Sequence, residues 1–135
     1  MKEAVYKWEI VDDLLIAFGT SGPISDRDWD GFFKQLQNPQ VKRHLGATIG
    51  AIETNSVQRK AASNVLKVRK IPVVVVTSAS IVRGIVTAVS WLGVDIKAFD
   101  WPDLQKGMDS LGVTGSQQDR AVEILLRMKA NNAAR

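Results

Sequence analysis

The middle of the chain repeats one pattern, in which an apolar strand is followed by hydroxyl and amide residues and then by a helix. The first unit has its apolar segment at 47–53 and its helical run at 57–70; the second has them at 72–76 and 81–92. The polar residues between strand and helix are Thr54, Asn55 and Ser56 in the first unit, and Thr77 and Ser78 in the second. Buried strands joined by crossover helices are typical of a parallel sheet. Such folds carry function where strand ends meet helix starts.

The flanking segments complete an α/β fold. Residues 5–10 and 14–18 predict a β-hairpin, with the wholly apolar 14–18 as an inner strand. Ser25 is expected to cap a helix, and 95–99 predict a further strand. We therefore expect a mixed, mostly parallel five-stranded sheet with an N-terminal β-hairpin, crossover helices and an additional C-terminal helix at 116–130.

The length of 135 residues predicts one domain over 1–135, with a core at 4–113. The chain has no cysteine, which excludes disulfides and thiol catalysis. It also has no apolar run of the ~20 residues that span a bilayer, and its first residues lack the apolar core of a secretion signal. We expect a cytoplasmic protein without a cofactor or a bound metal.

The net charge of +4 is unevenly distributed, because no acidic residue lies between Glu53 and Asp95. A basic helix in this interval is compatible with a solvated outer face, and also with binding to phosphate, an acidic protein or an anionic membrane. No aromatic residues that would stack on bases alternate with these cations, so specific nucleic-acid binding is not expected. The cations are Arg59, Lys60, Lys67, Arg69, Lys70 and Arg83.

The polar residues at the two strand–helix junctions predict a binding rim. A hydroxyl or amide at a helix start caps a free backbone N–H, and the same geometry favours an anion. A phosphate on Ser56 would lie at the positive end of its helix, close to two cations. The predicted rim comprises Thr54, Asn55, Ser56, Arg59, Lys60, Thr77 and Ser78.

Catalytic machinery is not evident in the sequence. His44 is the only histidine, and no serine has a recognisable general base, so we do not expect an enzyme. Trp29, Phe32 and Phe33 form an apolar helical stripe that would line any ligand pocket between the first helix and the sheet. Trp29 and Trp91 are expected in the core.

Over residues 4–113 the chain resembles the STAS domain family, the anti-sigma factor antagonist fold, and in particular its STAS/SEC14-type single-domain bacterial proteins. The resemblance lies in the hairpin, the helix capped by Ser25, the strand ending at 54–56, the segment 72–78, and the segments 82–93 and 96–99. In antagonist proteins of this family a serine opening the second helix is phosphorylated by a partner kinase. Ser56 occupies the matching place, with Asn55 where the family has aspartate.

The resemblance implies a non-catalytic regulatory module for signalling. Its partner would be a protein, such as a regulatory kinase or an anti-sigma-like protein, and phosphorylation of Ser56 would control binding. The alternative is a small-ligand domain that binds a lipid or a nucleotide. The sequence leaves open the partner's identity, the oligomeric state and the role of the C-terminal helix.

Overall fold

The computed structural model describes residues 2–132 and contains one five-stranded sheet with the strand order β1-β2-β4-β6-β7. β1 and β2 form an antiparallel hairpin, and the other neighbours are parallel. This arrangement confirms the expected α/β fold with its mixed, mostly parallel sheet. The strands are β1 (Tyr6–Val11), β2 (Leu14–Gly19), β4 (Arg43–Thr48), β6 (Val73–Val76) and β7 (Ile96–Phe99).

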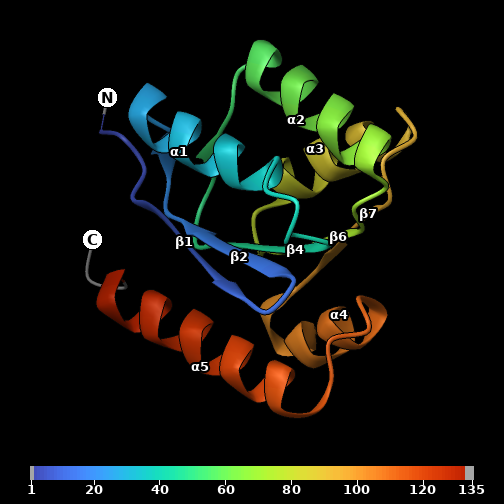
Figure 1. The fold of residues 1–135 in the computed structure, drawn as a ribbon. Helices are drawn as coiled ribbons and strands as arrows, with labels where there is room; N and C mark the ends of the chain where they lie inside the picture. Colours follow the sequence, from blue (N-terminus) through green and yellow to red (C-terminus); the bar gives the residue numbers. More distant parts are fainter. Residues whose placement is uncertain (1, 133–135) are drawn as a thin grey trace.

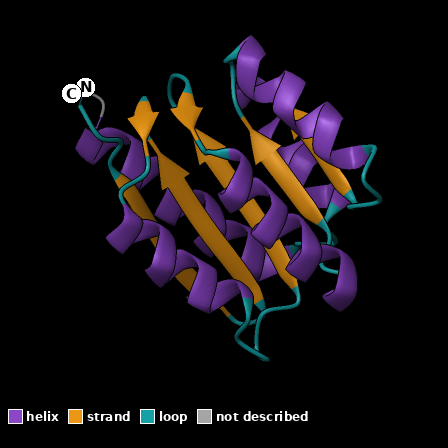
Figure 2. Cartoon of the chain, turned by 90° about the horizontal axis from the view of Figure 1, so that it is seen from above, coloured by secondary structure: helices purple, strands orange, loops and turns teal. Residues whose placement is uncertain are grey.

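Helices cover both faces of the sheet (Figure 1). One face carries α1 (Asp26–Leu36), α2 (Ser56–Arg69) and α3 (Ser80–Ser90). The other carries α4 (Leu104–Ser110), preceded by the 3-10 turn η1 (Trp101–Asp103), and α5 (Gly115–Asn132). Figure 2, seen from above, shows the helices running roughly along the strands that they cover. The expected C-terminal helix is thus present and covers a face of the sheet.

β2 is the centre of two apolar cores, and all six of its residues are buried. Its alternating side chains point to opposite faces, so Leu14, Ile16 and Phe18 pack toward α4 and α5, whereas Leu15 and Ala17 pack toward α1 and α2. The prediction of an inner strand at 14–18 is confirmed. β1 forms one edge of the sheet, as its mixed composition indicated.

The strand expected at 47–53 was placed incorrectly. β4 runs from Arg43 to Thr48, and the chain then leaves the sheet through Gly50, whose φ of +84° favours glycine. Ile52–Glu53 (β5) pairs instead with Gly22–Pro23 (β3) in a separate two-stranded sheet.

The polar start of β4 is compatible with a buried strand because its side chains have partners. The Arg43 guanidinium lies 2.6 Å from the Asp13 carboxylate, and His44 Nδ1 lies 2.9 Å from the Leu15 carbonyl.

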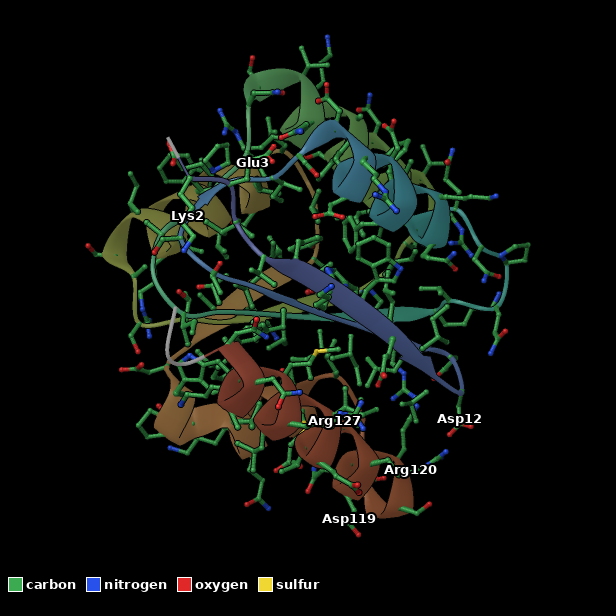
Figure 3. The ribbon with its side chains drawn as sticks, turned by 90° about the vertical axis from the view of Figure 1, so that its left-hand side faces the viewer. Lys2, Glu3, Asp12, Asp119, Arg120 and Arg127 are labelled. Carbon is green, nitrogen blue, oxygen red and sulfur yellow. The ribbon has the colours of Figure 1, made fainter. Side chains whose placement is uncertain are left out.

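α5 lies against the hairpin (Figure 3). Arg120 pairs with Asp12 at the hairpin turn at 2.7 Å, and Arg127 pairs with Glu9 of β1 at 2.9 Å. Beneath these exposed pairs the helix is fixed by buried apolar residues: Ala121, Leu125 and Met128.

Candidate functional site

The start of α2 is built by a capping box. The Asn55 side chain accepts a hydrogen bond from the Gln58 backbone N–H at 2.8 Å, and the Gln58 side chain accepts one from the Asn55 N–H at 3.0 Å. These two bonds satisfy backbone donors that a helix start otherwise leaves free. Ser56 is the first helical residue and is exposed. The helix therefore begins with an amide cap and leaves the hydroxyl of Ser56 at the surface.

Thr54 and Arg59 are joined across the same helix start. The Arg59 guanidinium donates to the Thr54 carbonyl and lies 3.3 Å from the Thr54 hydroxyl. Lys60, one residue further along, is exposed. Thr54, Asn55, Ser56, Arg59 and Lys60 are therefore brought together at one end of α2.

Thr77 and Ser78 make a second cluster at the ends of β6 and β7. Thr77 is fully buried, and its hydroxyl lies 2.7 Å from that of Thr48 at the end of β4. Ser78 donates to the Asp100 carboxylate at 2.6 Å, and this hydrogen bond lowers the pKa of that carboxyl. β4 and β6 are neighbours, but it is Thr48 that faces Thr77. Residues 49–53 follow β4 before Thr54, so Thr54 is not the residue of this segment that pairs with Thr77, although Thr48 and Thr54 line one cavity.

The aromatic residues of α1 pack against β1 and β4. Phe32 is buried, with its ring centroid 5.2 Å from that of Tyr6 and 5.3 Å from that of His44. Trp29 and Phe32 line a cavity of about 160 Å³, whereas Phe33 stacks on the Trp29 ring at 5.9 Å. Trp29 also lines a second cavity of about 160 Å³ that shares His44, Val75, Val89 and Ile96 with the first.

His44 forms part of this packing. Its burial lowers the pKa of the imidazole from 6.5 to about 4, so the ring is neutral near pH 7. Its Nδ1 lies 2.9 Å from the Leu15 carbonyl, which can only accept a hydrogen bond, so Nδ1 carries the proton. The ring joins β4 to β2.

A groove of about 970 Å³ lies between α2 and α3 on this face, and we call it the α2–α3 groove. Each helix contributes residues spaced three or four apart, as expected of one helical face. The α2 wall consists of Ser56, Arg59, Lys60, Ser63, Asn64 and Lys67. The α3 wall consists of Ile81, Gly84, Ile85, Ala88 and Val89 of α3, and of Leu92 in the turn that follows the helix.

The α3 wall exposes large apolar side chains. Ile81 is 62% exposed and Leu92 is 59% exposed, and Trp91 beside them is 82% exposed. The expectation that Trp91 belongs to the core is therefore wrong. α3 uses Val82 and Val86 to pack on the sheet, which turns its other apolar stripe outward. The sequence signal for this was an apolar stripe on more than one side of the helix, next to a segment without acids.

The two ends of α2 are attached differently. At the C-terminal end, the Arg69 guanidinium donates to the carbonyls of Leu36 and Val41 at 2.6 and 3.0 Å. These bonds fasten that end of α2 to the last residue of α1 and to the loop that follows it. The N-terminal end is held by its capping box and by bonds to Thr54 within the same segment.

No protein-family model matches this chain, and no curated protein matches it significantly. Over residues 2–132, no helix is long and apolar enough to cross a membrane. In the same part of the chain, no group of three or more His, Asp or Glu residues is placed to hold a metal ion. The features of the molecule that bear on its function are therefore the sheet, the start of α2 and the α2–α3 groove.

Proposed function

We propose that this chain is a non-catalytic, STAS-like regulatory module that binds a protein partner through the start and exposed wall of α2. Phosphorylation of Ser56 would control the partner's access. The observation that carries the proposal is the position of Ser56, which is exposed in the first turn of α2 and lines one end of the groove beside Arg59 and Lys60.

The local geometry suits a phosphoserine. A phosphate would add about −1.5 to −2 charge at the positive end of the helix, which favours it. Asn55 stands in the place of the aspartate found in antagonist proteins, and its side-chain oxygen caps the helix as an aspartate would. Modification of Ser56 would therefore leave the helix start intact and change mainly the charge of the α2 wall.

The experiment is an affinity purification from the native host with the wild-type chain, Ser56→Ala and Ser56→Asp. We expect a specific protein that binds wild type and Ser56→Ala alike and is lost or gained with Ser56→Asp. Ser116→Asp is the matched control, because Ser116 is also exposed in a first helical turn but lies on the other face, on α5. Identical partners for all variants would contradict gating, and no specific partner would contradict the binding function.

Small-ligand binding is the second candidate, favoured by the two aromatic-lined cavities beside Trp29. At about 160 Å³ each, they are smaller than the roughly 300–1,000 Å³ of common ligand pockets. Their apolar lining suits part of a lipid better than a nucleotide, which needs several polar contacts. Native mass spectrometry of the purified chain tests this candidate: a retained ligand supports it, and a mass equal to the bare chain contradicts it.

A further inference from the structure

The α2–α3 groove has one apolar wall and one cationic wall. Ile81, Ile85 and Leu92 supply apolar surface on the α3 wall, and Arg59, Lys60 and Lys67 supply positive charge on the α2 wall. No carboxylate lies on either helix, because residues 54–94 contain no Asp or Glu. The cations of the groove therefore have no counter-charge on their own elements, next to apolar surface that monomeric proteins usually cover.

We infer that the α2–α3 groove binds an acidic amphipathic helix of a partner protein. This inference rests on the proposed function and names the chemistry of the partner. The apolar stripe of such a helix would lie on the α3 wall, and Asp or Glu residues along its adjacent edge would face the cations of the α2 wall. Charge complementarity of this kind gives specificity and speeds association.

A helix suits the groove better than an extended segment does. Both walls are helices, whose backbone groups are already bonded within the helix, so an added strand would find no free sheet edge there. A helix satisfies its own backbone and needs only side-chain contacts. α3 has 11 residues and is about 16 Å long at a rise of 1.5 Å per residue, which corresponds to roughly three turns of a partner helix.

The middle of the α3 wall allows close approach. Gly84 and Ala88 are four residues apart and therefore lie on one side of the helix. A Cβ added at Gly84 would meet no atom within 4 Å, so the space above it belongs to the groove and not to the fold. Large apolar residues of the partner would fit over this small-residue strip, between Ile81 and Leu92.

Charge and shape disfavour two other occupants of the groove, a second copy of the chain and an anionic membrane. A second copy docking by the same surface would bring the cations of two α2 walls together. A flat anionic membrane would meet the rims of the groove and leave its concave floor uncovered. We retain both as outcomes of the experiment.

In the experiment, the purified 135-residue chain is the target, and binders are selected from a display library of 16-residue peptides. Each position of the peptides is randomised among acidic, basic, polar and apolar residues. We expect enriched peptides to carry apolar residues at i, i+3, i+4 and i+7, with Asp or Glu beside that stripe. Dissociation constants of selected peptides are then measured by fluorescence anisotropy at low and moderate salt. We expect binding to weaken as salt rises.

Two pairs of variants locate the binding. Gly84→Phe places a ring in the groove from a position whose Cβ would meet no atom within 4 Å, and is expected to weaken binding at least tenfold, whereas Gly84→Ala is expected to change it less than threefold. The double variant Lys60→Glu with Lys67→Glu is expected to weaken binding at least tenfold. The control for charge is Lys106→Glu on α4, which covers the other face. Circular dichroism and urea unfolding of each variant establish that it is folded.

Several results would overturn the inference. The inference fails if no peptide is enriched, if the enriched peptides lack the acidic edge or the apolar stripe, or if Gly84→Phe binds them as tightly as wild type does. Self-association abolished by Gly84→Phe would reassign the groove to a second copy, and binding to phosphatidylglycerol vesicles abolished by Gly84→Phe would reassign it to a membrane. If the affinity purification yields a Ser56-dependent partner while the library yields no acidic helices, the proposed function stands and only this inference fails.

Discussion

The two faces of the sheet are covered in different ways. On the face of α4 and α5, one apolar core runs from β2 to Leu125, and α5 also pairs its arginines with the hairpin. On the other face, α1 and α2 pack over an aromatic cluster, but α2 and α3 leave a groove between them. α5 buries Ala121, Leu125 and Met128 in this core and leaves Leu126 half exposed, whereas α3 leaves Ile81 62% exposed beside the groove. The two faces therefore differ in where exposed apolar side chains gather, and on the face of α2 and α3 they gather along the groove.

The sharpest test of this comparison is a matched pair of leucines. Leu125→Ala removes a fully buried side chain of α5 and is expected to lower the free energy of unfolding by about 2–5 kcal/mol. Leu92→Ala removes one that is 59% exposed on the α3 wall and is expected to lower it by less than ~1 kcal/mol. Urea unfolding measures both. Equal losses would show that Leu92 is buried in solution and that the groove is closed.

The pH dependence of the free energy of unfolding tests whether water reaches His44, which is packed between α1 and the sheet. The pKa of His44 is lowered from 6.5 to about 4, so the unfolded chain binds its proton first as pH falls. The contribution is fully present above pH 6.5 and is lost as pH falls toward 4, by up to about 3 kcal/mol.

The measurement is the free energy of unfolding between pH 4.5 and 7.5. In His44→Asn this part of the slope should disappear, because the amide keeps a donor for the Leu15 carbonyl and does not titrate. Asp13 adds its own acid dependence, since the Arg43 hydrogen bond lowers the pKa of its carboxyl, but that loss falls at lower pH. A slope unchanged in His44→Asn would place water around the imidazole.

At the start of α2, Asn55 is expected to stabilise the fold, whereas Ser56 is expected to be available for regulation. Asn55→Ala removes the capping bond and is expected to cost about 1 kcal/mol of stability. Ser56→Ala is expected to change stability by less than ~0.5 kcal/mol, because Ser56 is exposed and is not the cap. Thermal or urea unfolding compares the two. A larger loss for Ser56→Ala would mean that its hydroxyl supports the fold, which weakens the case for regulation there.

The smallest effect is expected from the ion pairs that hold α5 to the hairpin. Arg127 and Glu9 are each about half exposed, so a double-mutant cycle to alanine should give a coupling of about 0.2–1 kcal/mol that falls with added salt. A coupling well above this range would make charge, and not the buried stripe of α5, the main reason why that face is closed.

Most of the fold could be predicted from local sequence. The hairpin, the helix capped by Ser25, the apolar strand β6 and the C-terminal helix all follow from periodicity and capping, and the Ser25 hydroxyl accepts its bond from Asp28 at 3.1 Å. β4 was misplaced because it begins with Arg43 and His44. Their partners, Asp13 and the Leu15 carbonyl, lie about 30 residues away in the sequence.

The candidate site was predictable only in part. The cluster around Ser56 follows from the polar residues that open α2, but the pairing of Thr77 with Thr48 depends on where β4 ends. The groove could not be predicted, because a helix with apolar residues on several sides does not reveal which stripe packs on the sheet. The position of Trp91 shows this, since its sequence context is that of a core residue and its side chain is exposed.

The side-chain hydrogen bonds of α2 differ between its two ends. Arg69 ties the last turn to the carbonyls of Leu36 and Val41, whereas within residues 2–132 the side-chain hydrogen bonds of the first turn stay in its own segment. A rotation of α2 about Arg69 would displace Ser56 farthest, since the two residues lie at opposite ends of the helix. Ser56, the residue proposed to receive a phosphate, would therefore move farthest if the α2–α3 groove widened.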